Sequence, residues 1–360
     1  MSQVILRDIV KQFGAGTPPA VDHLDLSISD GEFLVLLGPS GCGKTTTLRM
    51  IAGLELPTSG EISIGDRVVT HLPPGDRDIA FVFQFYALYP HLSVRDNISF
   101  PLRAQQVPKA EVDRRVSEIA ARLRIEHVLK RRPNRLPAGE QQRVALGRAI
   151  VRQPQVFLMD EPLTNLDAAL RADMRVELKH LQQELGTTTV YVTHDQIEAM
   201  SMSNRIAVIN LGVLQQVGTP LEIYNHPQTL FVATFIGSPP MNTIPCKIAE
   251  GGLLVGGDFR LSLGDASLPT GKDVILGIRA ESITLVSGEV DADMRGEILV
   301  REPLGDETIY TVTVGGVTLV AKTPPRQMHK PGETVGLNID RARIHLFDVA
   351  TEQALQRVQV

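Results

Sequence analysis

The sequence has few cysteines, no long apolar run and no excess of positive charge, and each lack excludes a class of protein. Its two cysteines, Cys42 and Cys246, argue against a disulfide framework and fit a reducing compartment. No run of about 18 apolar residues occurs, so no transmembrane helix is expected. Residues 1–13 lack the apolar core of a signal peptide. The net charge of -5 argues against a general nucleic-acid binder, which usually has a basic surface.

The chain of 360 residues predicts two domains, at about 100–200 residues per domain. Residues 1–235 alternate short buried strands with helical segments, which predicts an α/β domain with a mainly parallel sheet. Residues 87–151 are expected to form a helical insertion, because 109–125 and its neighbours have apolar side chains at helical spacing. Residues 236–360 contain short alternating segments and frequent glycine, which predicts a small all-β barrel or sandwich.

The stretch "GPSGCGKT", residues 38–45, follows a predicted strand and precedes a predicted helix. Its glycines allow the backbone N–H groups to point at phosphate oxygens. Lys44 is expected to reach the β- and γ-phosphates of a nucleotide, and the Thr45 hydroxyl to bind Mg²⁺. A tight glycine-rich turn without a ligand is the weaker alternative in this context. The predicted nucleotide-binding residues here are Gly38, Pro39, Ser40, Gly41, Cys42, Gly43, Lys44, Thr45 and Thr46.

Two acids end the predicted buried strand "VFLMDE", residues 156–161. Asp160 is placed to hold Mg²⁺, directly or through water. Glu161 is a candidate general base for a water that attacks the γ-phosphate. Acids at a strand end are usually only solvated, but the phosphate loop makes the catalytic interpretation the stronger one.

Three further side chains are candidates for the same site. His194 follows a buried strand, and the carboxyl ends of parallel strands gather at the ligand edge of a sheet, so it could contact the γ-phosphate. Gln84 follows another strand and could orient water or bind the metal. Phe13 could stack on adenine, although a plain core position is nearly as good an explanation.

The turn "LPAGEQQR", residues 136–143, lies at the far end of the helical insertion, directly before "VFLMDE". The order of these motifs, followed by "MDEPLTNLDA" and "VTHD", resembles the ATPase subunit of an ABC transporter. The segments "YALYPHLSVRDNI" and "IGSPPMN" resemble the bacterial sugar-importer branch, whose ATPase is maltose-importer-like. The resemblance covers nearly the whole chain and is most specific over residues 1–235.

This resemblance implies a P-loop ATPase domain with a RecA-like core and a helical subdomain, followed by an OB-like regulatory domain. It implies the cofactors ATP and Mg²⁺. The implied ligands of the metal are Thr45, Gln84 and Asp160. Two ATPase subunits, identical or different, would sandwich ATP head to tail. Two integral-membrane permease subunits, and indirectly an external solute-binding protein, would be partners at the cytoplasmic face of the inner membrane, without nucleic acid. The implied residues of the opposite half-site are Pro137, Ala138, Gly139, Glu140 and Asn165 to Asp167.

The turn 136–143 departs from the family signature, which usually reads Leu-Ser-Gly-Gly-Gln. Pro137, Ala138 and Glu140 replace the serine, the first glycine and the glutamine, whereas Leu136 and Gly139 remain. Proline offers neither a hydroxyl nor an N–H to the γ-phosphate, and Glu140 adds negative charge near it. We therefore expect near-normal nucleotide binding, slow hydrolysis and weak ATP-driven closure. In the segment "LTNLD" the family commonly has a serine where this chain has Thr164, which is a mild change.

Three other functions fit parts of the sequence. A DNA-repair or chromosome-organising ATPase would need long coiled-coil arms, and no sustained heptad run occurs. A small-molecule kinase would not need the 136–143 turn or a second domain of this kind. A non-transport regulator with weak hydrolysis stays open because of the altered turn. The solute is not specified by the sequence: carbohydrate is favoured, and glycerol phosphate esters and polyamines remain open.

Overall fold

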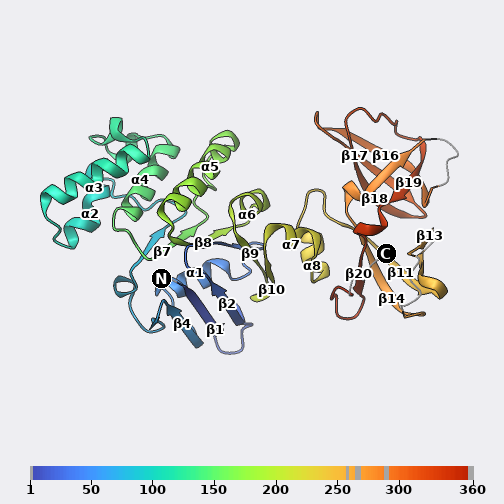
Figure 1. Cartoon of the computed structure of the whole chain (residues 1–360), viewed down its shortest axis with the longest axis horizontal. Coiled ribbons are helices and arrows are strands. Elements are labelled where there is room, and N and C mark those ends of the chain that lie inside the picture. Colours follow the sequence, from blue (N-terminus) through green and yellow to red (C-terminus); the bar gives the residue numbers. More distant parts are fainter. Residues whose placement is uncertain (1–2, 257–258, 264–268, 288–291, 356–360) are drawn as a thin grey trace. The chain divides into compact units, whose positions relative to one another are not determined.

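The computed structural model describes residues 3–256, 259–263, 269–287 and 292–355. Contacts divide the chain into two compact units, Met1–Pro220 and Leu221–Val360, which are described separately (Figure 1). The domain boundary predicted after residue 235 stays a prediction. The structural division comes earlier in the chain, because two short helices pack with the β-strands of the second unit: α7 (Pro220–Asn225) and α8 (Leu230–Phe235).

The N-terminal unit contains a six-stranded sheet with the order β10-β9-β3-β8-β7-β6. All neighbouring pairs in it are parallel except the closing hairpin β9–β10, so the predicted mainly parallel sheet is confirmed. Its central strands are buried along their whole length, as expected for strands covered on both faces. The strands are β3 (Phe33–Leu37), β6 (Ile79–Val82), β7 (Val156–Asp160), β8 (Thr188–Thr193), β9 (Arg205–Asn210) and β10 (Val213–Gly218).

A second, antiparallel sheet has the order β2-β1-β4-β5. Its strands alternate buried and exposed side chains, which is typical of a sheet with one face on a core. Its buried face shares one apolar cluster with the parallel sheet and with the first helix, so the two sheets stabilise each other. The strands are β1 (Val4–Lys11), β2 (Val21–Ile28), β4 (Ser59–Ile64) and β5 (Arg67–Val68).

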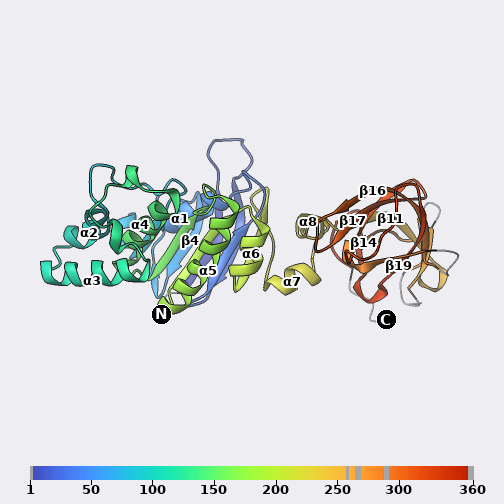
Figure 2. The ribbon, with the colours of Figure 1, turned by 90° about the horizontal axis from the view of Figure 1, so that it is seen from above.

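The helices of the N-terminal unit form two groups (Figures 1 and 2). Three helices gather beyond the sheet as a subdomain, and all three lie within the residues predicted to be helical: α2 (Val94–Ala104), α3 (Lys109–Arg122) and α4 (Ala138–Ile150). Only short 3₁₀ turns occur between α3 and α4, at Glu126–Val128 and Pro133–Arg135. The others are α1 (Lys44–Ala52), α5 (Ala168–Leu185) and α6 (Gln196–Met202).

Beyond α8, the described residues of the C-terminal unit form two five-stranded antiparallel sheets, which confirms the all-β fold predicted for residues 236–360 (Figure 2). Alternating apolar side chains of both sheets form one core around the buried Tyr310. The first sheet contains β11 (Asn242–Ala249), β12 (Leu253–Gly256), β13 (Phe259–Ser262), β14 (Asp273–Ile278) and β20 (His345–Asp348). The second contains β15 (Ile283–Val286), β16 (Met294–Pro303), β17 (Thr308–Val314), β18 (Val317–Thr323) and β19 (Thr334–Ile339).

One buried arginine explains why α7 and α8 belong to the C-terminal unit. The Arg279 guanidinium donates hydrogen bonds to the carbonyl oxygens of Ile236, at 2.5 Å, and Tyr224, at 2.8 Å. It also stacks on the Tyr224 ring, 3.9 Å from the centroid. A buried guanidinium needs these partners, because an unsatisfied charged donor is costly. The contacts tie residues 224–236 to the end of β14.

Candidate functional site

Four parallel strands end at one edge of the sheet, and a predicted site residue follows each of them. Register pairs Leu37 with Thr193, Asp160 with Val192, and Val82 with Met159. The carboxyl ends of β3, β6, β7 and β8 therefore reach the same level. Ligands of open α/β sheets bind at this edge. The structure thus gathers the phosphate loop and the segments that carry Gln84, Glu161 and His194.

The loop of residues 38–43 joins β3 to α1 and needs glycine for two different reasons. A Cβ at Gly38 would lie 2.1 Å from the carbonyl oxygen of Ile209, so no side chain fits there. Gly43 has a φ of 106°, and a Cβ on it would lie 2.3 Å from the Ala20 carbonyl oxygen. The loop can therefore pack closely on its neighbours and end directly at the N-terminus of α1, a natural anion-binding position.

Lys44 is buried, and its ammonium is held by the loop itself. Its Nζ donates to the carbonyl oxygens of Gly38, at 2.8 Å, and Pro39, at 2.7 Å. These bonds fix the positive charge beside the loop amides. Cys42 is also buried, and burial raises the pKa of its thiol. An uncharged thiol fits a position beside a phosphate loop.

Thr45 and Asp160 form a pair of oxygen ligands across the site. The Thr45 hydroxyl donates to Asp160 Oδ1 at 2.9 Å. Burial raises the pKa of the Asp160 carboxyl, and the hydrogen bond from Thr45 opposes that shift. A partly buried carboxylate next to a hydroxyl is the kind of donor set that Mg²⁺ prefers.

Glu161 has a strained backbone and lies among the other predicted catalytic side chains. Its φ is 44°, in the left-handed region that non-glycine residues rarely adopt. Its N–H donates to the Val192 carbonyl oxygen at 3.0 Å, which holds this conformation. His194 Nδ1 lies 3.1 Å from one carboxylate oxygen of Glu161, and Gln84 Nε2 lies 3.5 Å from the other. Strain of this kind clusters at functional sites.

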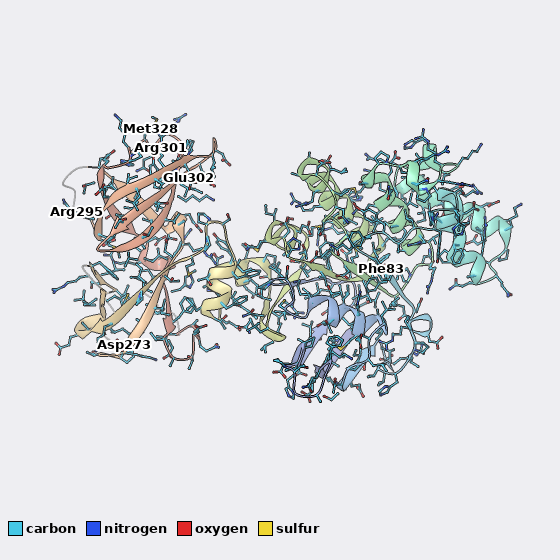
Figure 3. All side chains as sticks on the ribbon, turned by 180° about the vertical axis from the view of Figure 1, so that it is seen from behind. Phe83, Asp273, Arg295, Arg301, Glu302 and Met328 are labelled. Atoms are coloured by element: carbon cyan, nitrogen blue, oxygen red, sulfur yellow. The ribbon has the colours of Figure 1, made fainter. Side chains whose placement is uncertain are left out.

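The residues around Gln84 add contacts that the sequence did not indicate. The Thr164 hydroxyl lies 3.3 Å from the same Glu161 oxygen as Gln84. Asn165 Nδ2 donates to the Gln84 carbonyl oxygen at 2.9 Å. Asn165, implied by the resemblance as a contact to a second subunit, therefore also contacts its own chain. Phe83, beside Gln84, is partly exposed on the N-terminal unit (Figure 3).

Phe13 is not a core residue, so the alternative explanation for it is wrong. Its side chain is 65% exposed. The Lys11 ammonium lies over the ring, 4.9 Å from the centroid. The ring is exposed enough to stack on a base, and its contact with adenine stays a prediction.

The altered signature turn leads into a regular helix. Pro137 occupies the position before the first helical residue, with φ −57° and ψ 156°, and α4 begins at Ala138. A Cβ at Gly139 would lie 2.9 Å from the Leu170 side chain, so this glycine lets α4 approach α5. Glu140 Oε1 lies 3.0 Å from Nε2 of His127, within hydrogen-bonding distance.

Within one chain the signature turn and the phosphate loop are separate. The polar contacts that the structure describes for the turn stay local or lead to the helices: Gln141 donates to the Leu136 carbonyl oxygen, and Arg143 pairs with Glu177 on α5. Asp167 is exposed and caps α5 by accepting a hydrogen bond from the Leu170 N–H at 3.0 Å. Pro137 is exposed as well, so both residues are accessible to a second molecule.

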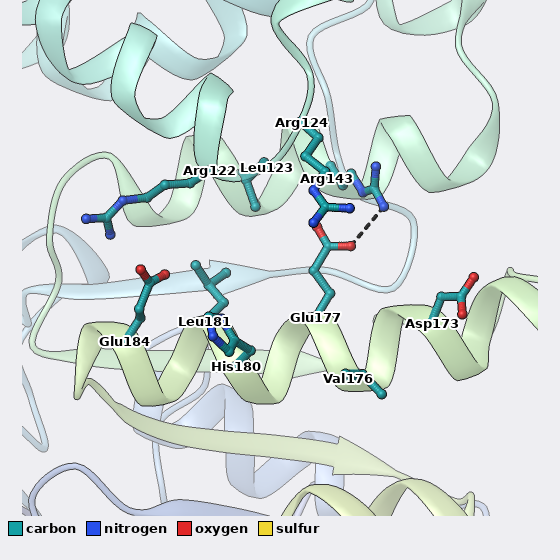
Figure 4. Close-up of a pocket in the computed structure, with 10 residues that line it drawn as sticks. All are labelled: Arg122, Leu123, Arg124, Arg143, Asp173, Val176, Glu177, His180, Leu181 and Glu184. Atoms are coloured by element: carbon teal, nitrogen blue, oxygen red, sulfur yellow. Dashed lines mark hydrogen bonds and ion pairs between the residues drawn. The ribbon is translucent and has the colours of Figure 1, made fainter.

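A cleft between the helical subdomain and α5 has walls of opposite charge (Figure 4). Arg143 Nη2 bridges it to Glu177 Oε2 at 2.8 Å. This ion pair attaches the signature helix to α5. The basic wall carries Arg122, Arg124 and Arg143, and the acidic side chains on α5 are Asp173, Glu177 and Glu184.

Nothing in the sequence assigned a contact to Arg143 or Arg148, and Thr164 was noted only as a mild change from the family pattern. Arg143 directly precedes the apolar run "VALGRAI", residues 144–150, and Arg148 lies within it. In the structure both side chains bind residues outside α4. An arginine beside buried positions of a helix is the one available signal, because a charged side chain there needs a partner. The partner itself is not visible in the sequence.

The sheet, the loop and the oxygen pair define the class of the protein: a P-loop nucleotide-binding domain joined to an all-β domain. The ABC transporter family model matches residues 21–164, the MalK OB fold domain matches 237–283, and the TOBE domain matches 276–347. Among the helices of the described residues, none combines the length and apolar character that a bilayer crossing needs.

Relatives match along the whole chain. The trehalose/maltose import ATP-binding protein MalK of Thermococcus litoralis is 52% identical, over 99% of this chain and 100% of that protein. The diacetylchitobiose uptake system ATP-binding protein MsiK of Streptomyces coelicolor is 48% identical, with the same coverage. The sn-glycerol-3-phosphate import ATP-binding protein UgpC of Psychromonas ingrahamii is 47% identical, over 99% of this chain and 96% of that protein.

A solved structure, the dimeric post-hydrolysis state of the ATP-binding cassette MJ0796 bound to ADP and Pi, is 33% identical. It aligns with a TM-score of 0.55 over 60% of this chain and 98% of that one. The chain belongs to the ATP-binding subunits of ABC importers, in the maltose-importer-like branch. It binds ATP and is an ATPase coupled to transport, and such subunits dimerise and work with membrane permease partners. These full-length matches do not favour the non-transport regulator as an alternative.

Proposed function

We propose that two ATPase subunits, most simply two copies of this chain, close head to tail on two ATP molecules and so drive solute import. The supporting observation is the single sheet edge that gathers the phosphate loop, Asp160, Glu161, Gln84 and His194. The signature turn lies apart from it, on a different subdomain. One chain therefore offers two half-sites, which a second chain can complete.

In this proposal the phosphate loop binds the β- and γ-phosphates, with Lys44 as the fixed positive charge. Thr45, Asp160 and the amide oxygen of Gln84 would hold Mg²⁺, and the oxygen donor set fits that ion. When bound, Mg²⁺ would neutralise part of the negative charge of the phosphates. Phe13 stacks on the adenine, and Pro137 to Glu140 with Asp167 cover the nucleotide from the other subunit.

Glu161 acts as the general base in this proposal, because its carboxylate is the group that His194, Gln84 and Thr164 all contact. It takes the proton of the attacking water. His194, which lies beside the other oxygen of that carboxylate from the one near Gln84, would contact the γ-phosphate. Gln84 orients the water from its position beside Glu161.

The proposed solute is a carbohydrate or a related polyol. The relatives are named for trehalose or maltose, diacetylchitobiose and sn-glycerol-3-phosphate, so sugars are the leading class and glycerol phosphate esters the runner-up. Two integral-membrane permeases bind the ATPase pair at the cytoplasmic face, and an external solute-binding protein acts through them.

Affinity purification of the tagged chain from its native membranes tests this assignment. We expect two polytopic membrane proteins to co-purify, and ATP turnover of the reconstituted complex to rise when a sugar-loaded binding protein is added. Recovery of the chain with only soluble partners would contradict a role in transport. Stimulation by a glycerol phosphate ester alone would correct the solute class.

The altered signature turn is expected to limit turnover. Replacing Pro137→Ser, Ala138→Gly and Glu140→Gln together restores a hydroxyl, an N–H and a neutral side chain near the γ-phosphate. We expect ATPase turnover to rise roughly tenfold or more, since about 1.4 kcal/mol of transition-state stabilisation suffices. Steady-state ATPase and ATP-induced dimerisation measure the effect. Glu140→Gln alone serves as the control for the contribution of the Glu140 charge, and equal rates in all variants would mean that the turn tolerates its residues.

A further inference from the structure

The turn that follows Gln84 has an unusual backbone. Tyr86 and Ala87 have φ values of 60° and 46°, so two consecutive non-glycine residues adopt the left-handed conformation. Such residues persist only where the surrounding contacts hold them. Short local bonds support the turn, with Tyr86 N–H donating to the Phe83 carbonyl oxygen at 2.9 Å. The carbonyl oxygens of Tyr86 and Ala87 accept hydrogen bonds from a side chain outside the turn.

The donor is Arg148, on α4, the helix that begins in the signature turn and is called the signature helix. Its Nη1 donates to the Ala87 carbonyl oxygen at 2.7 Å, and its Nη2 to the Tyr86 carbonyl oxygen at 2.9 Å. The two ends of one guanidinium thus bind both left-handed residues. The planar fork of arginine suits two adjacent acceptors, which a lysine ammonium cannot match in geometry.

The position of the guanidinium is itself fixed. It lies over the ring of Tyr89, 5.2 Å from the centroid. Tyr89 is held in turn by the buried Asn97, whose Oδ1 accepts from the Tyr89 N–H at 2.8 Å and whose Nδ2 donates to the Tyr89 carbonyl oxygen at 3.0 Å. Arg148 therefore connects α4 to a rigid segment rather than to a loose loop.

Gln84 is held on its other side by the catalytic edge. Its carbonyl oxygen accepts from Asn165, and its side chain lies beside Glu161. The backbone from Gln84 to Ala87 is thus anchored at one end by residues around the carboxylate and at the other by Arg148. A displacement of α4 must move this segment.

We propose that Arg148 is a positioning residue for ATP hydrolysis, which holds the Tyr86–Ala87 turn from the signature helix and so sets Gln84 against Glu161. The proposal rests on the roles given above to Gln84 and Glu161. Its consequence is that the helix carrying the signature turn and the carboxylate of the same chain are linked mechanically. Arg148 acts through Gln84 and does not touch the nucleotide.

The test compares Arg148→Met and Arg148→Lys with Arg114→Met in the full-length protein. Arg114 is a matched control, because it is an ion-paired arginine on the same subdomain but is exposed on α3. We expect Arg148→Met to lower kcat roughly 10- to 100-fold, the size of effect that a small misplacement produces. KM for ATP and nucleotide affinity measured without Mg²⁺ should stay within about twofold, since the phosphate loop is untouched. Arg148→Lys should recover part of kcat, and Arg114→Met should match wild type.

Hydrogen–deuterium exchange gives a readout independent of turnover. Amides of residues 83–93 should exchange faster in Arg148→Met, with the phosphate-loop amides unchanged. Loss of nucleotide affinity together with kcat in both Arg148 variants would show a general structural role and overturn the proposal. Unchanged exchange of residues 83–93 would overturn it as well.

A double-mutant cycle with Gln84→Ala separates this proposal from the one on which it rests. If Arg148 acts through Gln84, Arg148→Met has little further effect on kcat in the Gln84→Ala protein. Additive losses would overturn the proposal. Wild-type turnover in Gln84→Ala would overturn both the role of Gln84 and the role of Arg148, whereas slow Gln84→Ala with wild-type Arg148→Met would overturn the present proposal alone.

Discussion

Glu161→Gln is expected to lower ATP turnover by a factor on the order of 10²–10⁴, while ATP still binds. The amide has the shape of the carboxylate and keeps a hydrogen-bonding side chain between Gln84 and His194, but it cannot take a proton from water. Nucleotide binding should survive, because Lys44 and Thr45 are unchanged. The variant should therefore accumulate as a closed, ATP-bound dimer, which in the wild type is transient because ATP is hydrolysed.

Steady-state ATPase and size-exclusion chromatography with ATP and Mg²⁺ measure the two parts of this result. Glu118→Gln is the matched control, because Glu118 pairs with Arg114 on the exposed face of α3. It should leave both turnover and dimerisation unchanged. Comparable turnover in Glu161→Gln and wild type would remove Glu161 from the role of general base.

Lys44→Ala is expected to weaken ATP binding itself, by roughly 10- to 100-fold, because charged hydrogen bonds of this kind contribute about 1.5–3 kcal/mol. The ammonium is buried and already positioned by the Gly38 and Pro39 carbonyl groups. Its loss removes the charge that meets the β- and γ-phosphates. It also leaves two carbonyl groups without that partner.

Calorimetric titration with ATP in the presence of Mg²⁺ measures this loss of affinity. Lys272→Ala serves as the control, since Lys272 is ion-paired with Asp348 in the C-terminal unit. Wild-type affinity in Lys44→Ala would contradict the proposed binding mode. The two variants differ in kind: Glu161→Gln stops turnover with nucleotide bound, and Lys44→Ala stops it by emptying the site.

The phosphate loop and the strand ends could be predicted from the sequence because their signals are local. The spacing of glycines before Lys44 and the acids after a buried strand each occupy fewer than ten adjacent residues. That these segments meet follows from a parallel sheet, whose strand ends share one edge. The strand order, which sets β8 beside β3 and β7, came only from the structure.

The contacts that link the motifs could not be predicted, because each joins residues far apart in sequence. Arg148 reaches Tyr86, and Asn165 reaches Gln84, across the whole helical insertion. The His127 contact of Glu140 depends on an irregular stretch without a periodic pattern. No propensity or spacing rule states which carbonyl group a partly buried arginine will contact.

The most direct test of the head-to-tail ATP site is a cross-link between two different single-cysteine variants. Ser40→Cys marks the phosphate loop, Ala138→Cys marks the signature turn, and both are placed in the Glu161→Gln background to hold ATP. Native Cys42 and Cys246 are buried, and the unmodified background protein controls for them. After mixing and mild oxidation, we predict a cross-linked dimer that contains one chain of each variant and forms only with ATP. If both variants bind ATP and dimerise but no mixed cross-link forms, the signature turn of one chain does not cover the phosphate loop of the other, and the proposed site is wrong.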